Sequence, residues 1–249
     1  KSVTSLAIMG LLAKGAKVTG SVVLHGDELV GRTDAEMSKV RGNSLAMIFQ
    51  DPLSALTPVY TIGDQIVEAI QTHYPQVSKD AAMKRAVELL DLVGIPNPEL
   101  RVKSFPFEFS GGMRQRAMIA MSIANDPDVI IADEPTTALD VTIQAQVLEV
   151  LKKAQRETGA AIIMITHDLG VVAGMSDRVT VMYAGRPVEQ GTVDEIFYRP
   201  AMPYTIGLLG SVPRLDAQDR DALATLDGNP PAVVNLPPGC PFAPRCPMA

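Results

Sequence analysis

Two adjacent carboxylates, Asp133 and Glu134, are the residues best placed to do chemistry in this chain. They follow a short apolar run, residues 129–132, whose β-branched side chains predict a strand buried on both faces of a parallel sheet. Carboxylates at the carboxyl end of such a strand lie where open α/β sheets bind ligands. One carboxylate there suits Mg²⁺, and the next can act on a water molecule. The alternative is a core strand that ends in solvated acids, and the strand alone does not decide between the two.

Two further polar residues follow expected strands. Residues 45–49 predict a strand that ends at Gln50, and the Asp51-Pro52 pair after it favours a turn. Residues 161–166 predict a second buried strand, which ends at His167. A lone histidine after a strand is more often a surface or capping residue than a catalyst, so its role depends on what lies beside it.

Ser110, Gly111 and Gly112 stand at the start of an expected helix. Arg114 and Arg116 lie in its first turns, where positive charge opposes the helix dipole. We interpret this as a sign of an anion at the helix start, held by the Ser110 hydroxyl and the two glycine amides. A serine-capped surface helix is the alternative.

The elements that position these residues alternate between strands and helices, which predicts a doubly wound α/β sheet. A mainly helical insertion covers residues 53–109, and Lys1-Ser2 stands at the start of the first helix. From about residue 200 proline becomes frequent, which predicts a rigid, non-helical appendage with one helix near its start. The expected strands are 19–24, 45–49, 129–132, 161–166, 178–183 and 187–189; the expected helices are 2–12, 63–71, 78–93, 113–125, 141–157, 170–175 and 204–211.

Composition limits the functional classes. The 249 residues are 47% hydrophobic, enough for a sizeable core, and the net charge of −6 argues against a general nucleic-acid binder. No apolar run reaches the ~18 residues of a membrane-spanning helix, and we expect no signal peptide. Both cysteines lie near the end of the chain, so the bulk of the fold has no disulfide, which fits a reducing cytoplasm.

Four segments, in this order, resemble the motifs of the nucleotide-binding domain of ABC ATPases: LAMIFQDP, FSGGMRQR, VIIADEPTTALD and IMITHD. The resemblance covers residues 1–200 and implies a P-loop NTPase fold with a mainly parallel sheet and a helical subdomain at about 53–125. It makes residues 201–249 a C-terminal extension. The family's glycine loop would lie just before Lys1, so we expect an N-terminally truncated domain. Met113 replaces the usual glutamine, as in peptide-importer ATPases.

The resemblance assigns a first group of residues to ATP and its metal. Lys1 would contact the β- and γ-phosphates, and Ser2 and Asp133 would ligate Mg²⁺. Gln50 would sense the Mg²⁺ and the attacking water. Glu134 would act on that water as general base.

A second group would act across a pair of such domains. His167 would contact the γ-phosphate and hold the water geometry. Ser110, Gly111 and Gly112 would bind the γ-phosphate of the nucleotide held by the other subunit, because glycine lets the backbone approach closely. Asp140 would cross the dimer interface.

The C-terminal sequence GNPPAVVNLPPGCPFAPRCPMA resembles that of dipeptide and oligopeptide importer ATPases. There, Cys240 and Cys246 would begin a four-cysteine motif for a [4Fe–4S] cluster, which needs about four thiolates. Two reduced cysteines in a proline-rich loop are the alternative.

The implied function is that of the ATP-hydrolysing subunit of a membrane importer for di- and oligopeptides. It would work at the cytoplasmic face of the membrane with a second ABC ATPase, two transmembrane permease subunits and, indirectly, an extracytoplasmic solute-binding protein, without nucleic acid. A nickel-importer ATPase of the same family and a soluble, non-transport ABC ATPase remain alternatives. A non-catalytic regulatory subunit is a third, against which Glu134 and His167 argue.

Overall fold

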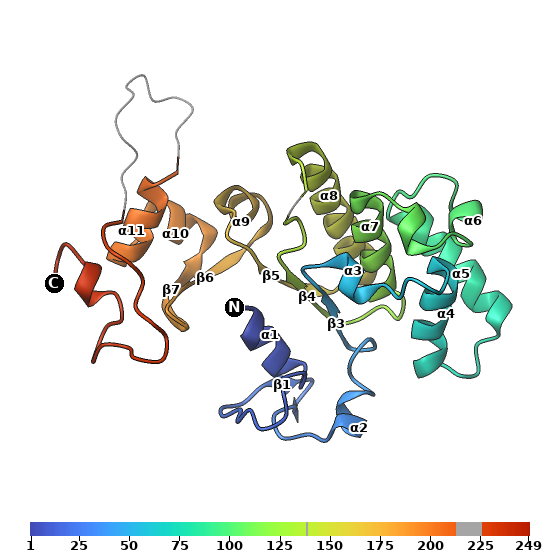
Figure 1. The fold of residues 1–249 in the computed structure, drawn as a ribbon, viewed down its shortest axis with the longest axis horizontal. Coiled ribbons are helices and arrows are strands. Elements are labelled where there is room, and N and C mark those ends of the chain that lie inside the picture. Colours follow the sequence, from blue (N-terminus) through green and yellow to red (C-terminus); the bar gives the residue numbers. More distant parts are fainter. Residues whose placement is uncertain (138, 213–225) are drawn as a thin grey trace. The chain divides into compact units, whose positions relative to one another are not determined.

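The computed structural model describes residues 1–137, 139–212 and 226–249, and it contains two compact units. The first unit is Ser2–His167; the second is Asp168–Ala249 together with Lys1. Figure 1 labels most elements of both units and colours the chain by residue number. Every residue of the first unit's sheet lies between Ser2 and His167, so that unit can be described by itself.

A parallel three-stranded sheet forms the centre of the first unit (Figure 1). Its strands are β3 (Leu45–Ile48), β4 (Val129–Asp133) and β5 (Ala161–Ile165), in the order β3-β4-β5. Ile48 pairs with Ala132, which pairs with Met164, so the three carboxyl ends lie at one edge. The middle strand is buried as predicted, because it has a neighbour on each side and helices packed on it.

The expectation that residues 161–166 form a second buried strand is wrong, because no residue of β5 is fully buried. β5 is the last strand in the order, and Ile163 is 46% exposed. A run of apolar residues predicts the strand, but the cover on its faces depends on its position in the sheet.

Helices α1 (Ser2–Ile8) and α7 (Gly111–Ser122) pack on the sheet, and a third helix, α8 (Val141–Thr158), packs on α7. α1 contacts β4, and α7 contacts β3. The buried residues of α8 recur at helical spacing, with the rest of the helix facing outward; they are Val147, Leu151 and Ala154. Beside α1 lie a short antiparallel pair, β1 (Val23–Leu24) and β2 (Asp27–Glu28), and α2 (Asp34–Met37).

The expected insertion between β3 and β4 is helical. It contains α3 (Pro52–Ala55), α4 (Ile62–His73), α5 (Lys79–Leu92), α6 (Pro98–Arg101) and the 3₁₀ turn η1 (Pro106–Glu108). Ser78 caps α5 as its sequence position suggests, accepting a hydrogen bond from the Ala81 N–H at 3.2 Å. Gly94, with φ at +71°, follows the end of that helix.

The second unit is built on a hairpin of β6 (Arg178–Tyr183) and β7 (Arg186–Thr192), which confirms the expected antiparallel pair. α9 (Leu169–Met175) precedes the hairpin, and α10 (Val193–Tyr198) and α11 (Pro203–Gly210) follow it. The chain's last short element is the 3₁₀ turn η2 (Ala243–Arg245).

Aromatic packing ties the proline-rich tail to this hairpin. Phe242 is fully buried and lies edge-on to Tyr183, with ring centroids 5.3 Å apart. Tyr204 of α11 packs on both rings, and burial raises the pKa of its phenol. Arg245 donates to the Tyr183 hydroxyl and to the Leu226 carbonyl. Where the structure describes it, the tail thus lies outside any sheet, as expected, and its end packs against the hairpin.

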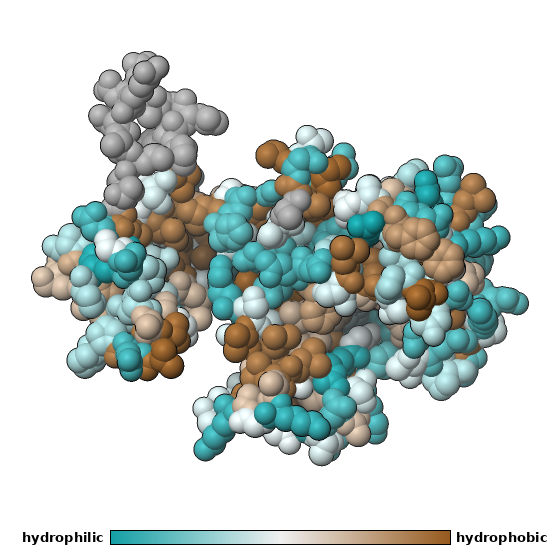
Figure 2. All heavy atoms as spheres, viewed as in Figure 1, coloured by the Kyte–Doolittle hydropathy of each residue, from teal (hydrophilic) through white to brown (hydrophobic). Residues whose placement is uncertain are grey.

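Figure 2 shows where apolar residues reach the surface. They gather over α1, among other places, and Val3 (66% exposed) and Leu11 (41% exposed) belong to this region of the chain. One face of α1 therefore lies in the core of the first unit, where Ser5 and the nearby Met9 are buried. Another face of the helix carries exposed apolar side chains such as Val3.

Candidate functional site

The carboxyl ends of β3, β4 and β5 bring Gln50, Glu134 and His167 together, as expected for strands that run parallel. The Gln50 side-chain amide donates to Glu134 Oε2 at 3.2 Å. His167 Nδ1 lies 3.4 Å from the other carboxylate oxygen, Oε1. The Glu134 side chain is 20% exposed and that of His167 is 71% exposed, so the carboxylate is sheltered while the imidazole stays open to a ligand.

The Glu134 backbone is held in an uncommon conformation. Its φ is +47°, a left-handed value that costs a non-glycine residue free energy. Its N–H donates to the Ile165 carbonyl at 2.8 Å, which extends the pairing of β4 with β5 by one residue. This bond and the turn that follows therefore fix the position of the Glu134 backbone, from which the side chain extends.

Ser2 and Asp133, the residue before Glu134, form a pair of oxygen ligands. The Ser2 hydroxyl donates to Asp133 Oδ1 at 3.0 Å, and Asp133 is 4% exposed. Mg²⁺ in nucleotide sites takes one or two protein oxygens and completes its shell with water and phosphate oxygens. The pair fits that donor set: one buried carboxylate and one hydroxyl already face each other.

Ser110 caps α7, since its hydroxyl accepts from the Met113 N–H at 3.3 Å. The two arginines that suggested a bound anion have other partners. Arg114 Nε donates to the Pro106 carbonyl at 2.8 Å, and Arg116 donates to the Gly94 carbonyl at 2.9 Å. Burial lowers the pKa of Arg116. These carbonyls explain the place of the two arginines on the helix, so the arginines are no evidence for an anion, and the anion at the helix start stays a prediction.

Close packing joins the starts of α7 and α8. A Cβ added to Gly112 would lie 2.6 Å from Ile143 Cγ2, whereas one added to Gly111 would lie 3.9 Å from Leu139. Asp140 caps α8, accepting from the Ile143 N–H at 2.9 Å. Gly112 is therefore required by packing, whatever its amide binds, and the predicted dimer contacts of Ser110, Gly111, Gly112 and Asp140 stay predictions.

The two cysteines are unpaired thiols. Cys240 is exposed, and Cys246 Sγ accepts from the Met248 N–H at 3.4 Å. Over residues 1–137, 139–212 and 226–249, no cluster of three or more His, Cys, Asp or Glu side chains could hold a metal ion. Two thiols are too few for an iron–sulfur cluster, so the described residues do not support that prediction. None of the described helices is long and apolar enough to cross a membrane.

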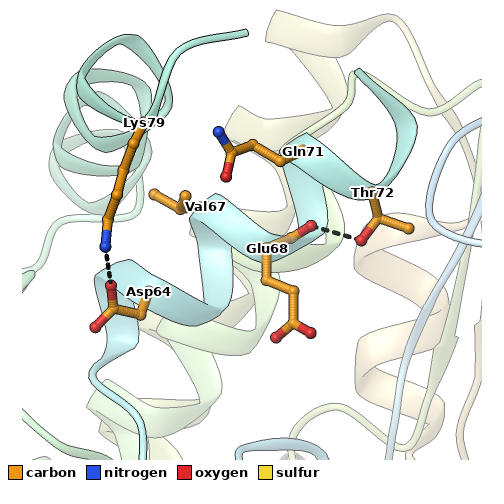
Figure 3. Close-up of a pocket in the computed structure, with 6 residues that line it drawn as sticks. All are labelled: Asp64, Val67, Glu68, Gln71, Thr72 and Lys79. Atoms are coloured by element: carbon orange, nitrogen blue, oxygen red, sulfur yellow. Dashed lines mark hydrogen bonds and ion pairs between the residues drawn. The ribbon is translucent and has the colours of Figure 1, made fainter. Parts of the chain in front are cut away.

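A hollow of about 410 Å³ lies on the exposed face of α4 (Figure 3). Across its rim, Lys79 Nζ lies 3.4 Å from Asp64 Oδ1, and the Thr72 hydroxyl donates to the Glu68 carbonyl. The lining residues include none of those predicted to bind nucleotide or metal. The chemistry is therefore assigned to the strand ends and not to this hollow.

Sequence reasoning missed one residue of the site. The Thr137 hydroxyl donates to Glu134 Oε2 at 2.8 Å. A signal was present in the sequence: Thr137 is three residues after Glu134 and two after a proline, where a β-turn brings the chain back.

The family model described as "ABC transporter" matches residues 1–137, more than half of the chain. The chain belongs to the ABC transporter family. A second model, described as "Oligopeptide/dipeptide transporter, C-terminal region", matches residues 188–249. The family resemblance expected from the four motifs and the C-terminal sequence is confirmed.

Curated relatives in this family match the chain from end to end. An "Oligopeptide transport ATP-binding protein OppD" of Mycobacterium tuberculosis is 60% identical over 100% of this chain. A "Dipeptide transport ATP-binding protein DppD" of Bacillus subtilis is 56% identical over 99% of this chain. An "Oligopeptide transport ATP-binding protein OppD" of Escherichia coli is 50% identical over 100% of this chain. The chain spans 40% of the mycobacterial relative's length and 74% and 73% of the other two.

Solved ABC structures share the fold. The ATP-binding cassette MJ0796, in a dimeric post-hydrolysis state bound to ADP and Pi, superposes with a TM-score of 0.66 at 28% identity. The match covers 77% of this chain and 80% of that one. The predicted P-loop NTPase fold of the ABC type is thereby confirmed.

Proposed function

We propose that this chain is the ATP-hydrolysing part of an ABC importer for di- and oligopeptides. The observation that carries the proposal is the Glu134 carboxylate, which Gln50 and Thr137 fix through one oxygen while the other faces His167. The adjacent Ser2–Asp133 pair supplies the oxygens a nucleotide-bound metal needs. The peptide assignment, in preference to nickel, rests on the printed names of the relatives and on the oligopeptide/dipeptide region at residues 188–249.

In this proposal Glu134 is the general base. It accepts a proton from water as the water oxygen bonds to the γ-phosphorus, and the bond to the β–γ bridging oxygen breaks. ADP leaves with that electron pair, and the products are ADP and phosphate. Gln50 orients the water, and His167 holds the γ-phosphate. Mg²⁺, when held by Ser2 and Asp133, would supply positive charge against the phosphate oxygens.

Catalysis would need two such domains. Ser110, with the Gly111 and Gly112 amides, would face the γ-phosphate of the nucleotide on the second ABC ATPase, and Asp140 would contact that subunit. Lys1 would contact the β- and γ-phosphates on its own side. The dimeric state of MJ0796 supports the pairing. Two permease subunits in the membrane and an extracytoplasmic solute-binding protein would complete the importer, with this chain at the cytoplasmic face.

Uptake measurements test the transport assignment. Cells that lack the gene should lose uptake of labelled di- and tripeptides and keep uptake of nickel. The full-length protein should restore peptide uptake, and the Glu134→Gln variant should not, because its side chain cannot accept the proton. Normal peptide uptake in the deleted strain, or loss of nickel uptake alone, would overturn the peptide assignment.

A further inference from the structure

A tight turn follows Glu134 and returns the chain to its side chain. The Thr137 N–H donates to the Glu134 carbonyl at 3.1 Å, which closes a four-residue turn. Pro135 occupies its second position, where the fixed φ of proline suits a turn, and Thr136 is buried at its third. The sequence Glu-Pro-Thr-Thr therefore places the side chain of Thr137 beside that of Glu134.

The Thr137 hydroxyl uses this position to hold the carboxylate. It donates to Glu134 Oε2 at 2.8 Å, and the Gln50 amide donates to the same oxygen at 3.2 Å. The other oxygen, Oε1, lies 3.4 Å from His167 Nδ1. These contacts distinguish the two oxygens: Gln50 and Thr137 donate to Oε2, and Oε1 lies beside His167.

Glutamate needs such support. Its backbone is fixed by strand pairing, but three side-chain torsions separate the backbone from the carboxylate, and the last of them is broad. A misplacement of about 1 Å at a reacting group can cost about a hundredfold in rate. Gln50 comes from a different strand end and forms the longer of the two bonds, so of these two donors Thr137 is tied more directly to the Glu134 backbone.

We propose that Thr137 is a positioning residue for Glu134: its hydroxyl holds Oε2 so that Oε1 faces the attacking water. This inference rests on the proposed function, because it concerns the same carboxylate. A threonine with only a structural role would stabilise the turn, and its loss would lower the melting temperature or ATP affinity. A positioning role predicts a different outcome, a fall in kcat at unchanged ATP affinity.

The test compares three variants of the full-length protein in an assay of phosphate release. Thr137→Val removes the hydroxyl at nearly constant shape and should lower kcat about tenfold, with KM for ATP within about twofold of wild type. Thr137→Ser keeps a hydroxyl and should retain kcat within about twofold. Thr136→Val makes the same chemical change at the buried neighbour and should also keep the wild-type kcat.

A fluorescent ATP analogue supplies a readout apart from turnover. Its Kd and the melting temperature should be the same for wild type and Thr137→Val. If the valine variant does not fold, Thr137→Ala removes the same hydroxyl without adding bulk, and the comparison with serine stands. The inference is overturned if the valine or alanine variant turns over like wild type, if serine fails equally, or if only KM changes.

The same assay separates this inference from the proposed function. Absence of ATP hydrolysis by the wild type, or full hydrolysis by Glu134→Gln, would refute the proposed function itself. An inactive Glu134→Gln variant beside a fully active Thr137→Val variant would refute only the role of Thr137.

Discussion

Replacing Gly112 by alanine should destabilise the protein, while the same change at Gly111 should not. At Gly112 the new Cβ would lie 2.6 Å from Ile143 Cγ2, closer than carbon atoms approach in folded proteins. Isoleucine in a helix has one strongly preferred χ1 rotamer, so this methyl group cannot turn away at low cost. At Gly111 the nearest side-chain atom, in Leu139, would be 3.9 Å away, an ordinary contact.

The size of the effect follows from two opposing contributions. Overpacking costs about 1–3 kcal/mol, while alanine in a helix gains up to about 1 kcal/mol over glycine. The net cost at Gly112 is therefore about 1 kcal/mol, which lowers the melting temperature by about 2–4 °C in a protein of this size. Gly111→Ala has only the gain and should melt at or slightly above the wild-type temperature.

Thermal unfolding followed by circular dichroism measures both variants, and Ile143→Ala completes a double-mutant cycle. Because Ile143→Ala removes the clashing methyl, the double variant Gly112→Ala/Ile143→Ala should be more stable than the two single changes summed predict. The reasoning is refuted if Gly112→Ala melts at or above wild type, or if the two changes simply add. Gly111→Ala should keep the fold, so any loss of ATP turnover in this variant measures how closely the backbone at residue 111 must approach the phosphate. We expect its ATP turnover to fall.

Two further predictions concern stability. Ala184 has φ at +47° in the β6–β7 turn, a conformation that asparagine tolerates better than alanine. Ala184→Asn should therefore raise the melting temperature by about 2–4 °C, whereas Ala184→Val should lower it. Equal melting temperatures of the two variants would contradict this prediction. The Ser21 hydroxyl, with the Val22 and Val30 N–H groups, lowers the pKa of Glu28 to about 2, so its stabilising effect is present above pH 4.5 and is lost as the pH falls toward 2. The melting difference between wild type and Glu28→Gln should accordingly be largest above pH 5 and shrink on acidification, and a difference that grew at low pH would reverse the sign of the argument.

The positions of Asp133, Glu134, Gln50 and His167 at neighbouring strand ends could be predicted from the sequence. Each follows a short apolar run, and a parallel sheet brings such ends to one edge whatever the order of its strands. The cover over β5 could not be predicted in this way, because Ile163 is exposed by the strand's position at the end of the sheet and not by its own sequence.

Contacts between residues distant in the chain account for the other differences. Arg116 donates to the carbonyl of Gly94, 22 residues away, and no local pattern marks that partner. Gly112 was expected to bind a phosphate through its amide. The sequence does not show that Ile143 leaves no room for a side chain at this position, because that depends on how α7 and α8 pack. Phe242 stands in a proline-rich stretch that predicts a rigid appendage, and its full burial against two tyrosines of the second unit has no local signal in that stretch.

Turnover by Glu134→Gln in the full-length protein tests the central claim most directly. The amide keeps the size of the side chain but cannot take a proton from water, so ATP hydrolysis should fall by about a hundredfold or more. Binding of ATP should persist, since Ser2 and Asp133 are unchanged. Hydrolysis by this variant at the wild-type rate would contradict the assignment of Glu134 as the base.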